Sequence, residues 1–311
     1  MTGRTDGGNS LAGSGGAEFP PGQTGLSVSD IGRLLLRCDD RPGLVAAITS
    51  FLARAGANIV SLDQHSTQQT GGMFMQRTIF HLPGLAAARS ELEEDFRAQV
   101  AEPFGIDFRL TEAAKPKRVA LMASTEDHCL LDLLWRNRRG ELDMSVVMVI
   151  ANHAELADQV RPFGVPFIHV PASKDIRVEA EQRQLELLRG NVDLVVLARY
   201  MQILTPGFIE QVGVPLINIH HSFLPAFIGA APYRRAKERG VKLVGATAHY
   251  VTEDLDEGPI IEQDVVRVDH RHNVEDLIRL GADVERAVLS RAVQWHCEDR
   301  VLRYGNQTVV F

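Results

Sequence analysis

The first part of the chain, after its N-terminal segment, alternates apolar runs of strand length with two stretches of helical periodicity. The expected strands cover residues 33–38, 59–64, 72–81 and 106–110. One helix is expected between Pro42-Gly43 and Gly56, where Leu44, Ile48, Phe51 and Leu52 recur at helical spacing, and a second over 85–100. The order strand–helix–strand–strand–helix–strand predicts a ferredoxin-like βαββαβ domain.

From Arg118 onward, nearly continuous apolar runs alternate with helical stretches such as 177–188 and 206–212. The runs cover residues 119–123, 145–151, 166–170, 194–198 and 215–219. Strands that are apolar on both faces and joined by helical crossovers are typical of a parallel sheet with helices on both sides. Further expected elements are two strands, a long helix and a terminal hairpin, at 243–252, 259–268, about 274–298 and around Gly305-Asn306. We therefore expect an α/β fold whose second domain has a Rossmann-like, mostly parallel sheet.

The length of 311 residues fits two domains, at roughly 100–200 residues per domain. Residues 1–29 are rich in Gly, Ser and Pro and bury too little apolar surface to offset the cost of ordering, so they predict a disordered tail. We place the first domain at 30–112, a linker at 113–117 and the second domain at 118–311.

Charge and composition exclude some classes of partner and of site. Lys and Arg number 33 against 40 Asp and Glu, a net charge of -7, so DNA and RNA are poor candidate partners. The sequence shows neither a secretory signal nor a bilayer-spanning apolar run, and we expect a cytoplasmic protein without a membrane partner. Three widely spaced cysteines, Cys38, Cys129 and Cys297, argue against a disulfide framework or a thiolate metal site.

Candidate chemistry begins at the end of the run that closes on Asn218, Ile219 and His220. Successive strand side chains alternate between faces, so Asn218 and His220 point the same way, at the sheet edge where α/β proteins bind ligands. An acidic loop that contains Asp256 follows a later strand. From these residues alone two interpretations stay open. They form an acid/base set, or His220 is a hydrogen-bonded core histidine and the acids are solvated.

A family resemblance rests on three groups of residues. Two segments resemble the folate-dependent formyltransferase superfamily. They are Asn218-Ile219-His220 before Ser222-Phe223-Leu224-Pro225, and His249-x6-Asp256-x-Gly258. Its folate-binding segment is similar to Arg199-Tyr200-Met201-Gln202-Ile203-Leu204. The N-terminal part resembles an ACT domain in Asp40-Arg41-Pro42-Gly43-Leu44 and Gly56-Ala57-Asn58-Ile59. An ACT domain followed by a formyltransferase-type domain is the layout of the formyltetrahydrofolate deformylases, and the resemblance covers about residues 30–311.

The resemblance implies hydrolysis of 10-formyltetrahydrofolate to formate and tetrahydrofolate, which would supply formate for purine synthesis and balance one-carbon folate pools. The catalytic residues that it implies are Asn218, His220 and Asp256. Substrate contacts are implied for Arg199, Met201, Ile203, Leu204 and His249. An amino-acid effector is implied near Asp40, Gly43 and Asn58. The resemblance further implies a homo-oligomer that needs neither a cofactor nor a metal.

The loop after the first strand of the second domain favours water as the formyl acceptor. Glycinamide ribonucleotide transformylases carry there a loop of Gly, Ser and Asn whose amides hold the acceptor phosphate. Here residues 124–128 contain no glycine and two acids, which would repel phosphate. His221 also resembles the deformylases, because the transferases usually have Pro there. Ala231 departs from the larger, often polar or basic residue expected in deformylases, which concerns the rim of the pocket.

Three other functions compete with this interpretation. A folate-dependent formyltransferase with an unidentified acceptor would release no formate without that acceptor. A metal-dependent amidohydrolase would use His220, His221, His249 and Asp256, although adjacent histidines on a strand point to opposite faces. A non-catalytic folate or amino-acid sensor would have no need of the complete Asn/His/Asp set.

Overall fold

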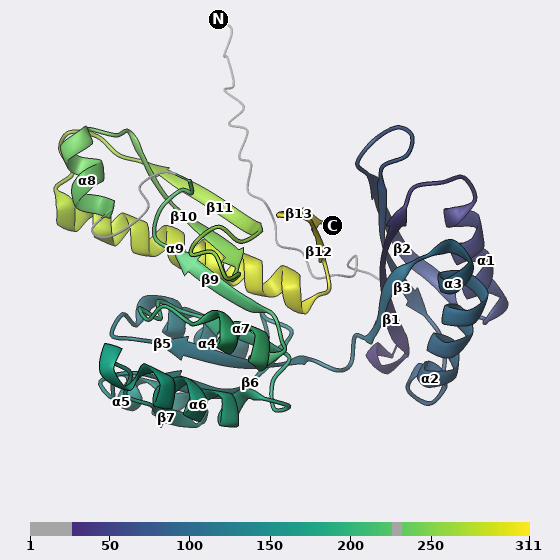
Figure 1. Ribbon diagram of the computed structural model, residues 1–311, viewed down its shortest axis with the longest axis horizontal. Coiled ribbons are helices and arrows are strands. Elements are labelled where there is room, and N and C mark those ends of the chain that lie inside the picture. The colour runs from purple at the N-terminus through teal and green to yellow at the C-terminus, as the bar shows by residue number, and fades with distance from the viewer. Residues whose placement is uncertain (1–26, 226–231) are drawn as a thin grey trace, which may run out of the picture.

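The computed structural model describes residues 27–225 and 232–311, which form two domains lying side by side (Figure 1). The expected N-terminal tail lies outside the described residues as far as residue 26. Val28–Asp30 then form a short 3-10 helix, η1, which leads into the first strand.

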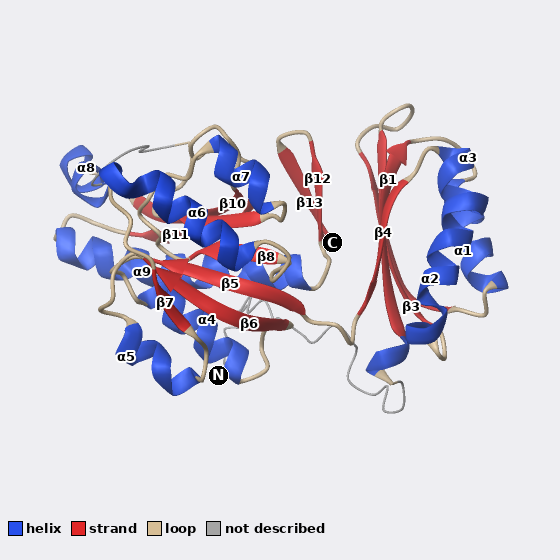
Figure 2. Ribbon diagram, turned by 60° about the horizontal axis from the view of Figure 1, so that its bottom comes forward, coloured by secondary structure: helices blue, strands red, loops and turns tan. Residues whose placement is uncertain are grey.

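The N-terminal domain is a four-stranded antiparallel sheet in the order β2-β3-β1-β4. Its strands are β1 (Ile31–Asp39), β2 (Asn58–Ser66), β3 (Met73–His81) and β4 (Asp107–Glu112). Helices α1 (Leu44–Arg54) and α2 (Leu85–Phe96) cover one face of the sheet, and the core lies between them and the strands (Figure 2). The predicted ferredoxin-like order is confirmed.

The second helix of this domain differs from the expected single helix over 85–100. It leaves α-helical geometry after Phe96, continues as a π-helical turn, η2 (Arg97–Ala101), and ends in α3 (Glu102–Phe104) before Gly105. The physical reason is Pro103, which has no amide proton for an α-helical bond and would clash with the preceding turn. Phe96 and Val100 both lie in the core.

The C-terminal domain has a seven-stranded sheet in the order β11-β10-β9-β8-β5-β6-β7. Its strands are β5 (Lys117–Ala123), β6 (Met144–Ala151), β7 (Phe167–His169), β8 (Leu194–Leu197), β9 (Leu216–His220), β10 (Leu243–Tyr250) and β11 (Ile260–Arg267). The five strands from β9 to β7 are parallel, and β10 runs antiparallel to β9 and β11. The predicted mostly parallel sheet is therefore confirmed.

Helices cover both faces of this sheet. They are α4 (His128–Arg138), α5 (Ala157–Val160), α6 (Arg177–Leu188), α7 (Pro206–Val212), α8 (Pro232–Arg239) and α9 (Val274–Cys297). The 3-10 turns η3 (Arg161–Phe163) and η4 (Lys174–Ile176) and the hairpin β12 (Val301–Tyr304) with β13 (Gln307–Val310) complete the domain. None of the described helices combines the length and the apolar character needed to cross a membrane.

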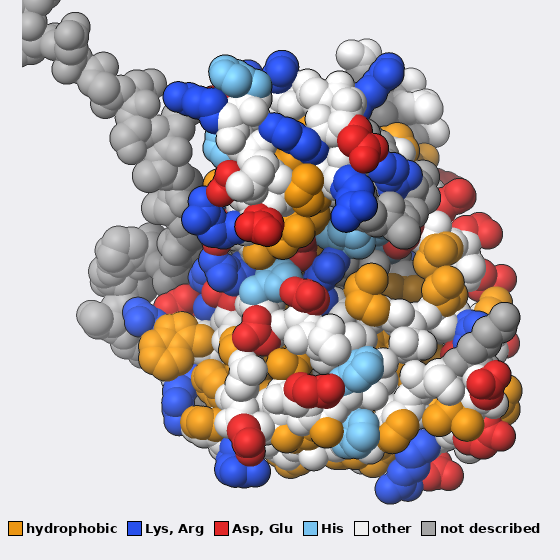
Figure 3. All heavy atoms as spheres, turned by 90° about the vertical axis from the view of Figure 1, so that its left-hand side faces the viewer, with side chains coloured by type: hydrophobic (Ala, Val, Ile, Leu, Met, Phe, Trp, Pro, Cys, Tyr) orange, Lys and Arg blue, Asp and Glu red, His pale blue; other side chains and the backbone are white. Residues whose placement is uncertain are grey.

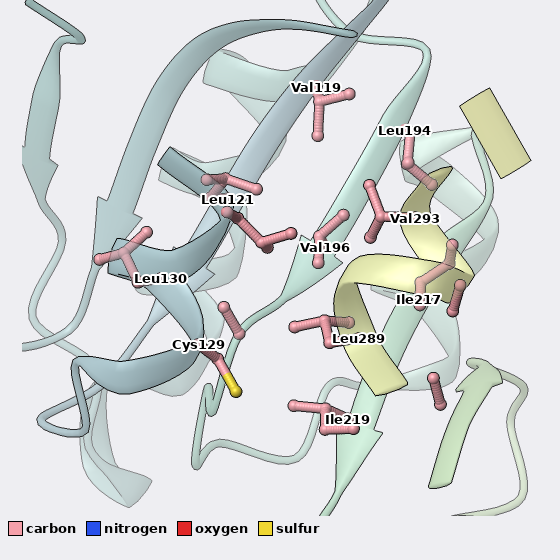
Figure 4. Packing of buried hydrophobic residues seen from close by; sticks show 14 of the residues in the cluster. Val119, Leu121, Cys129, Leu130, Leu194, Val196, Ile217, Ile219, Leu289 and Val293 are labelled. Atoms are coloured by element: carbon pink, nitrogen blue, oxygen red, sulfur yellow. The ribbon is translucent and has the colours of Figure 1, made fainter. Parts of the chain in front are cut away.

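Successive side chains of β5 alternate between the hydrophobic cores on the two faces of the sheet. Val119 and Leu121 pack with residues of α4 and α9, such as Leu289, on one face (Figure 4). Ala120 and Met122 pack on the other face, under α6 and α7. Because all four side chains are fully buried, no face of the strand is left for water, which explains its nearly continuous apolar sequence.

The two domains are joined through Asp299, which follows α9 and is 1% exposed. Its carboxylate accepts from Lys117 Nζ at 2.7 Å and from Thr111 Oγ1 at 2.8 Å, and pairs with Arg109 at 2.9 Å. Its carbonyl oxygen accepts from Arg77 Nε at 2.9 Å. Burial would raise the pKa of the Asp299 carboxyl, but these cations outweigh burial and lower it. The C-terminal end of α9 is thus held by β3, β4 and β5.

Candidate active site

A pocket of about 450 Å³ opens at the carboxyl ends of β8 and β9. Its walls come from β9, the segment 199–204 after β8, and the loop 251–256 after β10. Figure 3 views this end of the molecule, where histidine, acidic and apolar side chains lie close together. The place agrees with the expectation that ligands bind beyond the carboxyl ends of parallel strands.

Strand β9 turns Asn218 and His220 into the pocket, whereas Ile217 and Ile219 belong to the core packed against α9 (Figure 4). Strand β10 is the antiparallel neighbour and pairs His249 with Asn218. The pairing brings the His249 ring beside the amide, with Asn218 Nδ2 3.2 Å from His249 Nε2. Two adjacent strands thus supply three polar side chains to one wall of the pocket.

Asp256 reaches the same wall from the loop that follows β10. Its backbone is left-handed, with φ 59°, and the loop passes so close to Tyr250 that a Cβ on Gly258 would lie 1.8 Å from the Tyr250 carbonyl oxygen. Only glycine fits there. This close passage holds Asp256 Oδ2 3.2 Å from His220 Nδ1 and Oδ1 3.6 Å from His249 Nε2.

The charge on Asp256 is set by its two histidine neighbours. Burial would raise the pKa of the carboxyl, but hydrogen bonds and charge from His220 and His249 outweigh burial and hold the pKa well below its usual range. Asp256 is therefore a carboxylate throughout the neutral range, stabilising positive charge on an adjacent imidazole.

Hydrogen bonds assign roles to the ring nitrogens. His249 Nδ1 lies 3.0 Å from the Tyr250 carbonyl oxygen, an acceptor, so Nδ1 carries a proton, and Nε2 faces both Asn218 Nδ2 at 3.2 Å and Asp256 Oδ1 at 3.6 Å. His220 directs Nδ1 at Asp256. Its Nε2 is buried and has no hydrogen-bond partner among the described residues. That nitrogen is the group available to a substrate.

The segment after β8 forms the mouth of the pocket. Met201 and Ile203 line the pocket and are more than half exposed, at 56% and 59%, while Leu204 lines it and is buried in the core beneath α7. The segment is held by Ser124, whose Oγ accepts from Met201 N at 2.9 Å and donates to Asn152 Oδ1 at 2.7 Å. The Ser124 hydroxyl is consequently engaged inside the protein. All five expected substrate contacts, Arg199, Met201, Ile203, Leu204 and His249, line the pocket.

Arg199 has an environment that the sequence analysis did not anticipate. Its backbone is left-handed, with φ 63°, and its Nε lies 3.5 Å from Glu285 Oε2. Glu285 is 2% exposed and also binds His128 and Tyr233. Next to this group, burial and then the Arg199 charge lower the pKa of His221 to about 4. The sequence carried one signal of Glu285, since an acid occupies the apolar stripe of α9 with Gly281, Val288 and Ala292.

Two groups of side chains carry donor atoms of the kinds that bind metals. Within the described residues, the donor atoms of His128, Cys129 and Glu285 lie within 4.8 Å of one another. Glu285 already accepts from His128 and faces the cationic Arg199. Burial raises the pKa of the Cys129 thiol, which disfavours the thiolate that binds metals. The surroundings of this group therefore do not favour a bound cation. The set shares no member with His220, His221, His249 and Asp256, the residues of the amidohydrolase alternative.

The three residues expected to surround an effector do not meet within one chain. Asp40 and Gly43 follow β1 at the end of the sheet where Asp39 pairs with Met73. Asn58 begins β2 and pairs with His81, at the other end of β3, about 26 Å away for eight residues at ~3.3 Å each. Ala231, the departure noted in the sequence, lies outside the described residues. The three cysteines are free and buried, as expected.

Comparisons with known proteins agree with this architecture. Residues 117–293 match the formyl transferase family and residues 32–96 match the ACT domain family. The formyltetrahydrofolate deformylase of Mycobacterium tuberculosis (strain H37Rv) is 78% identical over 91% of this chain and 91% of its own. That of Bacillus subtilis (strain 168) is 53% identical over 91% of this chain and 94% of its own.

Among solved structures, a deformylase matches nearly the whole chain, whereas a transformylase matches a smaller part of it. A formyltetrahydrofolate deformylase from Pseudomonas syringae superposes with a TM-score of 0.85 at 46% identity, covering 90% of this chain and 94% of its own. A glycinamide ribonucleotide transformylase from Symbiobacterium toebii matches at 32% identity with a TM-score of 0.59, covering 63% of this chain and 94% of its own. With both domains matched in order and the deformylases matched over nearly their full length, the chain belongs to the formyltetrahydrofolate deformylase family.

Proposed function

We propose that the protein hydrolyses 10-formyltetrahydrofolate to formate and tetrahydrofolate. The observation that carries the proposal is the buried His220 Nε2, which has no partner among the described residues and sits in the pocket beside Asn218 and the Asp256 carboxylate. A formyl group bound there would lie beside the His220 imidazole, the Asn218 amide and the Asp256 carboxylate, which belong to one wall of the pocket. The names of the relatives support the same reaction.

The geometry suggests which group moves the proton. Asp256, with its lowered pKa, is a weak base, and it stabilises the imidazolium form of His220 through Nδ1. We therefore assign proton transfer to His220 Nε2, which takes a proton from the attacking water and delivers it to N10 as the N10–carbon bond breaks. A remaining lone pair on the Asp256 carboxylate orients the water. General acid–base catalysis of this kind typically contributes about 10²–10⁴-fold.

Asn218 is assigned to the formyl oxygen. One hydrogen of its amide nitrogen is directed to His249 Nε2, which fixes the orientation of the side chain, and the second is available to the oxyanion that forms when water adds. A donor of this type typically contributes ~3 kcal/mol to the transition state. His249 thus acts through Asn218 and Asp256 as a positioning residue.

The apolar mouth of the pocket suits the folate ring system. Met201 and Ile203 offer exposed apolar surface at the opening, and the backbone of the segment is held by Ser124. The route from water to formate draws its proton carriers from side chains and needs no cofactor. The released formate would supply purine synthesis and balance folate pools, and the three free cysteines fit a reducing compartment such as the cytoplasm.

The test is incubation of the purified protein with 10-formyltetrahydrofolate without an acceptor, following formate and tetrahydrofolate. We expect the two products in equal amounts, and loss of both in His220→Asn. His65→Asn, an exposed histidine of β2 in the other domain, is the matched control and keeps full turnover. Dependence of product formation on an added acceptor would instead favour a folate-dependent formyltransferase.

The ACT domain supports a second, regulatory proposal. Because Asp40 and Gly43 lie at one end of the sheet and Asn58 at the other, an amino-acid effector that uses both ends must bridge two copies of the chain. We propose a homo-oligomer with effector sites between ACT domains. Titrating the free amino acids against turnover, with light scattering for the subunit number, tests this. No response to any amino acid would leave the domain without an effector role.

A further inference from the structure

A second pocket, of about 780 Å³, lies along α4. It is lined by His128 and Trp135 of α4 and by Arg286 of α9. The substrate pocket is lined by Arg199 and His221. Glu285 lines neither pocket and contacts a residue of each, His128 and Arg199. These three side chains therefore form a wall between the two pockets, called here the inner wall.

The inner wall is held by charge and by hydrogen bonds. Glu285 Oε2 forms a hydrogen bond with His128 Nε2 at 2.8 Å, and it attracts Arg199 by charge alone, with Nε at 3.5 Å. Tyr233 of α8 donates from its hydroxyl to Glu285 Oε1 at 2.7 Å. Burial alone would raise the pKa of Glu285, but His128, Arg199 and Tyr233 outweigh burial and lower it, so the carboxylate stays charged and attracts Arg199.

The packing around the inner wall leaves little room for it to open. Tyr233 lies so close to α9 that a Cβ on Gly281 would be 1.9 Å from its hydroxyl oxygen. The Cys129 sulfur lies within 4.8 Å of the His128 and Glu285 donor atoms and is fully buried. The charged carboxylate of Glu285 is 2% exposed and would lose one of its three partners if either flanking side chain moved away, which is disfavoured.

We infer that the inner wall is the specificity determinant that leaves water as the formyl acceptor. The inference rests on the proposed hydrolysis. Folate enters through the apolar mouth formed by Met201 and Ile203, so an amine acceptor needs another approach to the formyl carbon. Toward the second pocket that approach is closed by His128, Glu285 and Arg199. Water is small enough to be enclosed with the substrate, whereas a substituted amine is not.

Opening the inner wall would turn hydrolysis partly into transfer. In that reaction the N10–carbon bond breaks, a bond forms between the formyl carbon and the amine nitrogen, and the proton lost by the amine ends on N10. Nothing is oxidised or reduced. The only reagent added to the proposed reaction is a primary amine, for which glycinamide serves as the probe.

Arg199→Gly is the first variant, because its left-handed backbone favours glycine and the substitution removes only the guanidinium arm. With 10-formyltetrahydrofolate and glycinamide, the wild type is expected to form formate and tetrahydrofolate in equal amounts. In the variant, tetrahydrofolate exceeds formate and N-formylglycinamide accounts for the difference, at least a tenfold rise in the transferred fraction. Arg139→Gly, an exposed arginine at the end of α4, is the control and behaves as wild type.

Glu285→Gln is the second variant, since it keeps the volume of the side chain and removes the charge that holds Arg199. Opening is measured separately from turnover by alkylation of Cys129, with the buried Cys297 at the far end of α9 as the internal standard. We expect Cys129 to be alkylated at least tenfold faster in both variants and Cys297 to be unchanged.

Formate as the only formyl product from variants that still hydrolyse overturns the inference, and so does N-formylglycinamide from the wild type. If a variant folds but loses all turnover, alkylation decides, because an unchanged Cys129 shows that these side chains do not close the passage. Absence of formate from the wild type contradicts the proposed hydrolysis and leaves a different reaction to be identified.

Discussion

At the scale of single residues, the site depends on a carboxylate shared by two imidazoles. Asp256 lies 3.2 Å from His220 and 3.6 Å from His249, its backbone is left-handed, and its loop passes close to Tyr250 at Gly258. This arrangement lowers the pKa of Asp256, although burial alone would raise it. A negative charge at this point orients the His220 ring through its Nδ1.

Replacing Asp256 by Asn tests this role. The amide keeps the shape of the side chain and removes the charge, so imidazolium on His220 loses its stabilisation. We expect kcat to fall by about 10²–10⁴-fold, the usual contribution of general acid–base catalysis, with unchanged Kd for the folate. Stopped-time formate assays and a fluorescence titration measure the two quantities. Near-normal turnover in a folded variant would remove Asp256 from the mechanism.

At the scale of elements, α9 connects the site to the domain interface. Its buried stripe carries Gly281 against Tyr233, Glu285 beside Arg199, and His296 beside Tyr250. The helix begins with a capping box in which Asn273 and Asp276 satisfy each other's backbone amides. Its C-terminal end leads directly to Asp299. One continuous helix thus positions parts of the protein that lie far apart in space.

Gly281→Ala separates packing from helix propensity. In a free helix the change stabilises by about 1 kcal/mol, but here the new Cβ would lie 1.9 Å from the Tyr233 hydroxyl oxygen. We expect a net loss of ~1–3 kcal/mol in the free energy of unfolding, measured by urea denaturation. Gly207→Ala in α7 is the control, because its nearest neighbour would be Gln211 at 3.8 Å, an ordinary contact. Equal effects of the two changes would contradict the close packing of Tyr233.

His296 predicts how stability changes with pH. Burial, followed by the charges of Lys117 and Arg109, lowers its pKa to about 3, and its Nδ1 lies 2.8 Å from the Tyr250 hydroxyl oxygen. The unfolded chain, with a histidine pKa near ~6.5, takes up the proton first as the pH falls, so the contribution of His296 is full above that value and is lost toward pH 3.

We expect the free energy of unfolding of the wild type to fall between pH 7 and pH 5 more steeply than that of His296→Gln. The limiting slope for one such group is about 1.4 kcal/mol per pH unit. Urea denaturation at a series of pH values measures the difference. Parallel pH profiles for the two proteins would mean that His296 does not titrate on unfolding.

At the scale of the whole molecule, the ACT domain is docked through a buried charge network. Asp299 is 1% exposed and holds Lys117 of β5 and Arg109 and Thr111 of β4, while Arg33 of β1 pairs with Asp143 at 3.1 Å. The network lies where the interdomain linker enters the second sheet.

Asp299→Asn should loosen the docking of the domains. Asparagine tolerates the left-handed backbone at this position, where φ is 53°, so the effect is that of lost charge beside Lys117 and Arg109. Breaking a buried ion pair typically costs about 3–5 kcal/mol, and we expect that loss in thermal denaturation, with faster proteolysis around residues 113–117. Asp283→Asn, in an exposed pair with Arg286, is the control and should change stability by less than ~1 kcal/mol.

Local pattern was sufficient for most of the fold. Period-two alternation along β9 placed Asn218 and His220 on one face and Ile217 and Ile219 on the other, as the structure shows. This works because side-chain direction in a strand is a property of neighbouring residues. The same local reasoning gave one helix over 85–100 and missed the π turn that precedes Pro103.

The tertiary structure decided everything that joins distant segments. Asp256, 36 residues after His220 in the chain, entered the site through family resemblance, and only the pairing of β9 with β10 explains its position. Glu285 was visible in the sequence as an acid on an apolar stripe, which required partners without naming them. Its partners, His128, Arg199 and Tyr233, come from three other segments. Hydrophobic periodicity depends on residues that are neighbours in the sequence. The partners of a buried charge, in contrast, are residues that the fold brings close to it.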